Sequence, residues 1–205
     1  LYSSAASDVY KRQVQKRTRQ IKAALNKIEK HNLAMEQVLF NVISINPDIN
    51  GKFAIEVSEL ASKLARIARL EKEEIKQVRY AGLICELGLL GLESEDFKAP
   101  FSKLKYQQQQ NYLSQTKQAA LILAPAHELH QVSDIIEFQF EHYNGSGLYN
   151  KVAKEIPAGA RILAIARDYW RLVTGRMSGI EMSPRVATLE MKKHRNTRDD
   201  GECLD

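Results

Sequence analysis

Apolar side chains recur at alternating steps of four and three residues along the N-terminal part of the chain. This spacing begins at Ile21 and is typical of the a and d positions of a coiled coil. The seam consists of Ile21, Leu25, Ile28, Asn32, Met35 and Leu39. Its one polar member, Asn32, falls at an a position, where a buried asparagine fixes the register of a two-stranded parallel pair. We therefore predict a dimer-forming linker helix over residues 14–46. The alternative is an amphipathic helix that packs on the chain's own core.

Helix-breaking residues separate this segment from the rest of the chain. Pro47 and the pair Asn50-Gly51 predict that the first helix ends there. Beyond them, apolar residues follow helical spacing almost throughout, and strand-like alternation is essentially absent. The expected helices cover residues 53–68, 73–90, 111–124, 126–142, 157–174 and 183–194, with a polar connection over 91–110. The predicted fold class is all-α, a helical bundle preceded by a long N-terminal coiled-coil helix.

Both ends of the sequence are unusual. The first 13 residues read LYSSAASDVYKRQ, which is similar to translated sequencing-adaptor read-through, so we exclude them from fold reasoning as a non-native segment. The chain stops at Cys203-Leu204-Asp205 without a helix-stop signal, which favours a truncated C-terminus. The expected organisation is a foreign segment over 1–13, the linker helix over 14–46 and a helical domain over 51–205.

Composition and charge narrow the function classes. Hydrophobic residues make up 44% of the chain and charged residues 27%, which is ordinary for a globular protein. The formal charge is +5, but much of the excess lies near the two ends and no basic stripe alternates with aromatic residues, so we do not expect nucleic-acid binding. No apolar run is long enough for a membrane span. Cys85 and Cys203 lack metal-ligand spacing, which indicates reduced thiols and a cytoplasmic protein.

The C-terminal half carries a family resemblance. The segment EHYNGSGLYN, followed by EIPAGARILAIARDYWRLVTGRM, resembles the HHExxDGxGYP loop and the next helix of the HD-GYP family. Upstream, AGLICELGLLGL is similar to the segment that holds the family's HD doublet, and VSELASKLARIARL fits its first helix. The matching residues are Ala81, Leu83, Gly88, Gly91, Glu141, Gly145, Gly147, Ile156, Pro157, Ala160 and Arg161. The resemblance runs from Phe53 to about Leu189 and implies an HD-domain-like helical bundle.

The resemblance also implies a metal centre at defined positions. Members of the family hydrolyse cyclic di-GMP with two or three ions, usually iron or manganese, held by histidine and aspartate. The corresponding positions in this sequence are Phe53, Cys85, Glu86, Gln115, Gln139, Phe140 and Arg167. The lysine that follows the HD doublet corresponds to Leu89. Phenylalanine cannot coordinate a metal, and the guanidinium of Arg167 repels a divalent cation. We therefore expect no metal cofactor and no catalytic residue.

Other acids and histidines do not replace the lost ligands. Asp168 follows Arg167 directly, and one residue turns a helical side chain by about 100°, so we expect Asp168 to miss the site. His127 and His130 lie one turn apart, but no third ligand is evident beside them. His142 falls at a variable position of the loop motif and is interpreted as a solvated or capping side chain.

Two features of the sequence suggest a binding site for an anion. Gly145, Ser146 and Gly147 permit close backbone approach to a phosphate, although a turn between helices explains the glycines as well. Four arginines recur on one helix and at its exit: Arg161, Arg167, Arg171 and Arg176. They either form an anion pocket in place of the metals, with Arg167 and Arg171 on one face, or pair with acids on a solvated surface, which we prefer.

The expected function is a catalytically silent HD-GYP-type output module of a bacterial two-component or cyclic di-GMP pathway. It would form a homodimer through residues 14–46 and bind a signalling protein or a nucleotide. The family implies an N-terminal receiver or sensor domain joined by a helix. The rival hypothesis is an active phosphodiesterase with a rearranged site built on Glu86, Asp168, Glu141 and His142. A third is a nucleotide sensor that binds cyclic di-GMP without cleaving it.

Overall fold

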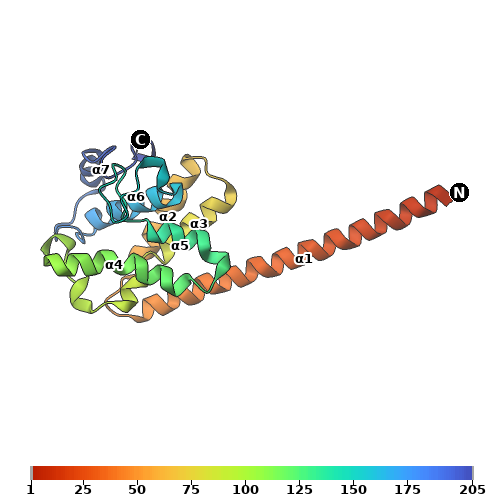
Figure 1. The fold of residues 1–205 in the computed structure, drawn as a ribbon, viewed down its shortest axis with the longest axis horizontal. Coiled ribbons are helices and arrows are strands. Elements are labelled where there is room, and N and C mark those ends of the chain that lie inside the picture. Colours follow the sequence, from red (N-terminus) through yellow and green to blue (C-terminus); the bar gives the residue numbers. More distant parts are fainter. Residues whose placement is uncertain (1, 205) are drawn as a thin grey trace. The chain divides into compact units, whose positions relative to one another are not determined.

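A computed structural model describes residues 2–204, with side chains from Tyr10 onward. The described chain holds eight α-helices joined by short 3-10 turns, and no strand (Figure 1). The helices are α1 (Tyr2–Ile45), α2 (Gly51–Ile67), α3 (Lys72–Leu83), α4 (Tyr106–Leu123), α5 (His130–Glu137), α6 (Ala158–Val173), α7 (Pro184–Lys192) and α8 (Gly201–Leu204). The all-α prediction is confirmed. The chain divides into two compact units, residues 1–39 and 40–205.

The first unit is a single helix that carries the predicted seam. The helix begins at Tyr2, so it includes most of the segment that we excluded as foreign. The side chains of residues 1–9 lie outside the described part, and the foreign origin of residues 1–13 stays a prediction. Ile21, Leu25, Ile28 and Met35 are between 42% and 60% exposed in a single copy of the chain. The pairing of this seam with a second copy therefore also stays a prediction.

The second unit begins at Phe40, so it includes the end of α1 as well as the break predicted at Pro47. Ile43 is buried near the end of α1, and α2 starts after Asn50, whose side chain accepts hydrogen bonds from the backbone N–H groups of Lys52 and Phe53. An asparagine that caps a helix in this way satisfies N–H groups that have no partner inside the helix. The break predicted at Pro47 and Asn50-Gly51 is confirmed.

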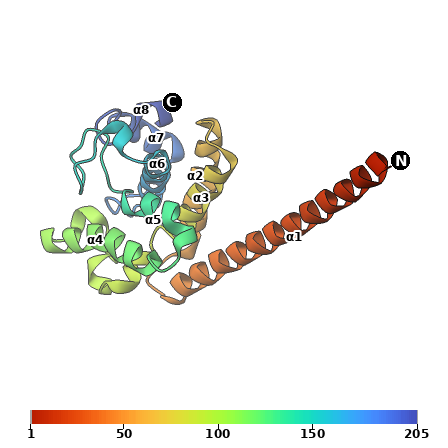
Figure 2. The same cartoon turned by 45° about the vertical axis from the view of Figure 1, so that its right-hand side comes forward.

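The core of the second unit lies between α2, α3 and α6. Figures 1 and 2 show α2 and α3 side by side, and α6 packs against both. α4 packs against α5 and against the 3-10 turn η1 (Leu87–Gly91). The buried side chains here are mainly aliphatic, and the largest include Val57, Val78, Ile84, Leu87, Ile136, Ile162 and Leu163. Burial of these faces against one another stabilises the bundle because it removes apolar surface from water.

Three element boundaries differ from the prediction. The helix expected over 73–90 ends at Leu83, and the apolar run beyond it forms turns and η1. The glutamines of 107–110 belong to the first turns of α4 rather than to the connection before it. The helix expected over 126–142 is shorter, because η4 (His127–Leu129) precedes α5 and the chain turns after Glu137. The short helix α8 was not expected.

Close packing of the backbone explains the first of these differences. A Cβ atom on Gly88 would lie 1.8 Å from the carbonyl oxygen of Gln115 in α4. η1 therefore passes so near to α4 that only a glycine fits at this point. The neighbouring Gly91 has no such constraint, since the nearest atom to its Cβ position is 3.7 Å away. The apolar run is buried as predicted, but the tertiary contact sets its conformation.

Replacing Gly88 tests this packing. We expect Gly88→Ala to lower the free energy of unfolding by about 3 kcal/mol or more, because the methyl group meets backbone that cannot move alone. Gly91→Ala serves as the matched control and should change it by less than about 0.5 kcal/mol. Chemical denaturation of both variants measures the difference. Equal stabilities would show that η1 does not approach α4 in this way.

Candidate functional site

The seven positions that correspond to the family's metal ligands lie on five different segments. Phe53 is on α2, the pair Cys85-Glu86 follows α3, Gln115 is on α4, the pair Gln139-Phe140 follows α5, and Arg167 is on α6. All seven side chains are buried, none more than 6% exposed. The contacts described below link six of them, Phe53 by way of Arg176, and their assignment as former ligand positions stays a prediction.

Arg167 lies at the centre of this group. Its Nη1 donates a hydrogen bond to the backbone carbonyl of Gln139, and its Cζ lies 4.1 Å from the ring centroid of Phe140. The side chain of Gln139 in turn donates to the carbonyl of Cys85 over 3.1 Å. These contacts use the guanidinium as a bridge between α6 and the segment after α5. The position that carries an aspartate in the family therefore holds a buried cation here.

The carboxylate of Asp168 lies within ion-pair distance of three guanidinium groups. Arg167 donates to its Oδ1 from Nε over 3.0 Å and from Nη2 over 2.8 Å. The Oδ2 atom lies 2.6 Å from Nη2 of Arg198, and Nη1 of Arg171 lies 3.7 Å from Oδ1. Asp168 is 3% exposed and faces the same cavity as Arg167. Our expectation that it would miss the site is wrong, because the side chain of Arg167 reaches toward its neighbour.

Two further arginines stack on aromatic rings. Arg176 lies 4.2 Å above the ring centroid of Phe53, and its Nη2 is 2.7 Å from Oε1 of Glu86. Arg171 lies 5.0 Å from the ring centroid of Phe101 and 5.2 Å from that of Tyr112. Stacked and desolvated guanidinium groups of this kind interact favourably with the ring faces. We call Arg167, Arg171, Arg176 and Arg198 the arginine cluster.

The arginines pair with acids as we preferred, but in the interior rather than on a solvated surface. Arg161 does not join the cluster. It forms an ion pair with Asp200, and its Nε donates to the carbonyl of Ile156. Two residues of the network were missed from the sequence: Arg198, which completes the ion pairs of Asp168, and the neighbouring Asp199. They lie in the charged run before α8, where no spacing linked them to the site.

The cluster controls the ionisation of the buried acids. Burial by itself raises the pKa of Asp168, but the guanidinium groups of Arg167, Arg198 and Arg171 outweigh it and hold the pKa well below its usual range. Burial raises the pKa of Asp199 to about 6, with the charge of Asp168 adding to the effect. Burial also raises the pKa of the Cys85 thiol, so this side chain stays protonated at neutral pH.

A metal centre does not fit this donor set. Residues 2–204 contain no group of three or more histidine, cysteine, aspartate or glutamate side chains that is arranged to hold a metal ion. Two of the acids in the region, Glu86 and Asp168, already face guanidinium groups. His127 and His130 are exposed, and Nδ1 of His130 lies 3.5 Å from Asp134.

The loop after α5 is held by Glu141. Its carboxylate accepts hydrogen bonds from the backbone N–H groups of Tyr149 over 2.7 Å and Lys151 over 2.8 Å. Gly147 passes so close that a Cβ atom there would lie 2.7 Å from the Cα atom of Glu141. Gly145 has a φ of 83°, in the left-handed region that favours glycine. The turn explanation of the glycines therefore accounts for both positions.

The predicted phosphate-binding residues do share a cavity. Ser146, Gly147, Arg167 and Arg171 line a space of about 380 Å³, which we call the loop pocket. His142 and Arg198 also line it, and Gly145 does not. Nδ1 of His142 lies 2.9 Å from the Ser146 hydroxyl, and burial, followed by the charge of Arg198, lowers the pKa of this histidine. His142 is partly exposed, and its interpretation as a solvated or capping side chain stays a prediction.

Asp199 gives a prediction of pH dependence. The residue is 2% exposed, and neither carboxylate oxygen accepts a hydrogen bond from residues 2–204. With its pKa raised from 3.8 to about 6, the folded protein binds the proton more tightly than the unfolded chain does. Its contribution to stability is therefore complete below pH 3.8 and is lost as the pH rises through 6, about 2–3 kcal/mol in all.

The Asp199→Asn variant removes this dependence. Relative to the wild type, we expect the variant to gain stability progressively from pH 4.5 to pH 7.5, measured by urea denaturation at each pH. The range lies above the titration of Asp168, and the titration of His142 is common to both proteins and cancels in the difference. Asp134→Asn, at a more exposed acid, should track the wild type. A constant difference between Asp199→Asn and the wild type would contradict the raised pKa.

No helix within residues 2–204 has the combination of length and apolar character that crossing a bilayer requires.

Comparison with known proteins identifies the family. The sequence model of the HD domain matches residues 8–203. No curated protein shows a significant match to the sequence. Among solved structures, Bd1817, an HDG"Y"P protein from Bdellovibrio bacteriovorus, is similar at a TM-score of 0.63 and 16% identity, over 77% of this chain and 50% of that one. A cyclic GMP-AMP specific phosphodiesterase of V. cholerae, V-cGAP3, is similar at a TM-score of 0.62 and 15% identity, over 83% of this chain and 46% of that one.

These two likenesses are likenesses of fold, since the identities are low, and the chain spans about half the length of either structure. The match of the family model to nearly the whole chain shows that this protein belongs to the HD domain family, and the two solved structures show that its fold is HD-GYP-like.

Proposed function

We propose that this chain is an HD-GYP-type signalling module that has lost metal-dependent hydrolysis and acts by binding. The observation that carries the proposal is the buried guanidinium of Arg167 at the position of a ligand carboxylate. A divalent cation placed beside it would meet repulsion in a region that water does not screen. Arg176, paired with Glu86, adds a second cation at the position of the HD doublet.

The two buried acids of the rival site already face arginines. Asp168 lies within ion-pair distance of three arginines and Glu86 of one. Glu141 accepts two backbone N–H groups of the loop, and Nδ1 of His142 is bonded to Ser146. A metal ion at Asp168 or Glu86 would meet the repulsion of these guanidinium groups. The geometry therefore favours the binding module over an active phosphodiesterase with a rearranged site.

The loop pocket supports an anionic ligand. Arg167, Arg171 and Arg198 line it together with the Ser146 hydroxyl, and charge-assisted hydrogen bonds from arginine are well suited to phosphate. The solved V. cholerae relative of the same fold is a phosphodiesterase for cyclic GMP-AMP. A cyclic dinucleotide such as cyclic di-GMP, bound without cleavage, is thus the small-molecule candidate, beside a protein partner in the same signalling pathway.

The proposed arrangement includes a dimeric helix and an input domain. The exposed seam on α1 would pair with the same seam of a second copy. A change in the pairing of such helices is transmitted to the domain that follows as a shift between two states. A receiver or sensor domain before α1 would use this route, in a bacterial cytoplasmic pathway.

Metal content and hydrolysis test the central proposal. The protein is purified without chelator after growth with iron and manganese, and its metal content is measured by plasma mass spectrometry. Hydrolysis of cyclic di-GMP and cyclic GMP-AMP is assayed on the same sample, with Glu86→Gln as a comparison. We expect metal far below one ion per chain and no turnover. Stoichiometric metal with turnover that Glu86→Gln abolishes would establish the rearranged enzyme instead.

Oligomeric state tests the seam. We expect the wild type to be a dimer by light scattering at tens of micromolar, and Ile28→Glu to be a monomer, because a charge at a d position would be buried in the pair. Lys27→Glu changes a neighbouring position outside the seam and should leave the dimer intact. A monomeric wild type would rule out the proposed pairing.

A further inference from the structure

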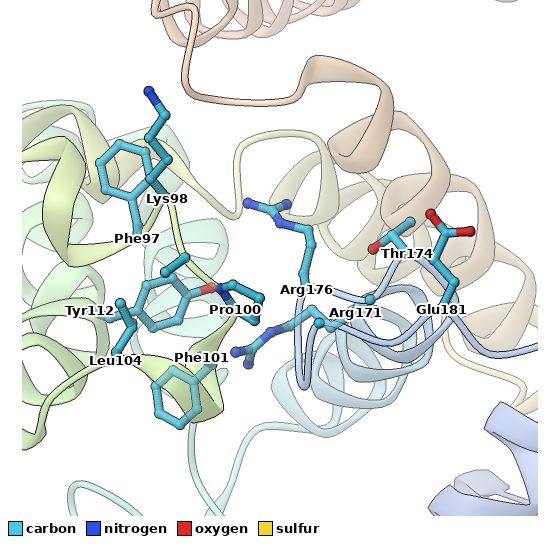
Figure 3. A pocket seen from close by; sticks show the side chains of 13 residues that line it. Phe97, Lys98, Pro100, Phe101, Leu104, Tyr112, Arg171, Thr174, Arg176 and Glu181 are labelled. Carbon is cyan, nitrogen blue, oxygen red and sulfur yellow. The ribbon is translucent and has the colours of Figure 1, made fainter.

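A second cavity lies beside the arginine cluster, apart from the loop and from the positions of the metal ligands. It has a volume of about 280 Å³ and is drawn in Figure 3. Arg171 and Arg176 line one side of it, and Phe97, Pro100, Phe101, Leu104 and Tyr112 line the other. We call it the aromatic pocket. Apolar, aromatic and charged side chains line it together, so it offers contacts to both the apolar and the charged part of a small ligand.

The arginines of this region differ in how closely the protein's own acids pair with them. Arg176 lies 2.7 Å from Glu86, and Arg167 and Arg198 take up most of the hydrogen-bonding capacity of Asp168. Arg171 is left at 3.7 Å from the same carboxylate. A buried charge without a close partner is costly, so an anion that approaches Arg171 more closely would be favoured.

The two arginines of the aromatic pocket have N–H donors that their acid partners do not fully use. Arg171 is 5% exposed, and the carboxylate of Asp168 lies 3.7 Å from its Nη1, beyond hydrogen-bond distance. Arg176 has its Nη1 buried without a hydrogen-bond partner among residues 2–204. Figure 3 shows the Arg171 guanidinium directed toward Phe101 and Tyr112. Guanidinium groups with donors to spare are the preferred partners of carboxylate and phosphate.

The rim of the pocket carries one charge of each sign. Lys98 lies at the mouth with a side chain that is 69% exposed, and its Nζ is 2.9 Å from Asp48. Glu181 also lines the pocket, but in Figure 3 its carboxylate points away from both guanidinium groups. Each of the three cations that line the pocket also has an acid partner outside the lining. The partner of Arg171 is the most distant of these, so Arg171 is the group in the pocket that an anion would contact to the greatest advantage.

We propose that the aromatic pocket binds a small organic anion, with its carboxylate or phosphate at Arg171 and Arg176 and its apolar part against Phe97, Pro100 and Leu104. The volume limits the ligand to a single ring or a short chain. This inference goes beyond the proposed function, since the site shares Arg171 with the loop pocket but neither its loop nor its other arginines.

Benzoate and its neutral analogue benzamide test the proposal, by calorimetry and ligand-detected NMR on the full chain. We expect saturable binding of benzoate with a Kd of roughly 1 mM or below, and binding of benzamide at least about tenfold weaker. Arg171→Gln and the surface change Lys98→Glu should each weaken benzoate binding, and Lys98→Glu keeps the test valid if the buried variant does not fold. Inorganic phosphate shows whether a charged group alone suffices; affinity equal to that of benzoate would contradict the role of the apolar wall.

Two controls locate the site. Lys63 lines a different cavity, so Lys63→Glu should leave benzoate binding unchanged. Ser146→Trp obstructs the loop pocket and should also leave it unchanged; loss of binding there would move the anion to the loop pocket and overturn the assignment. The proposal also fails if benzamide binds as well as benzoate, if neither Lys98→Glu nor a folded Arg171→Gln has an effect, or if no saturable binding occurs. None of these results depends on whether the protein hydrolyses a cyclic dinucleotide.

Discussion

The ion pairs of Asp168 are the interaction on which the site depends. This carboxylate neutralises Arg167 within α6 and reaches Arg198 in the segment before α8, so it joins two parts of the chain that are 30 positions apart. A buried ion pair stabilises a protein only where its geometry is good and its partners are satisfied, and the loss of one partner is strongly destabilising. Loss of Asp168 would leave buried arginines without a counter-charge, and loss of the arginines would leave Asp168 without one.

This arrangement differs from a metal site in where the counter-charge comes from. In a metal centre, carboxylates and imidazoles converge on a bound cation and need it to relieve their mutual repulsion. Here the cations are covalent parts of the chain, and they come from α6, from its exit and from the segment before α8.

Local signals predicted the parts of the fold that depend on local chemistry. Pro47, the pair Asn50-Gly51 and the helical spacing of apolar residues after them predicted the first break and the second helix, because helix breakers act on their own neighbours. The end of α3 was missed because it depends on the approach of Gly88 to Gln115, a contact between distant segments. The ligand positions followed from the resemblance, yet the network around them did not. A guanidinium can turn back to its own neighbour, as Arg167 does to Asp168, and helical periodicity does not describe this.

The backbone of the loop after α5 is tied to the C-terminal part of the domain. The N–H groups of Tyr143 and Asn144 donate to the carbonyls of Arg198 and Thr197, next to the side chain that pairs with Asp168. The loop and the ion pairs of Asp168 therefore both depend on the short segment 197–198. A protein partner that binds and displaces this segment would change the conformation of the loop and remove Arg198 from Asp168 at the same time. Binding at this segment would thus couple a contact outside the domain to the ion pairs inside it.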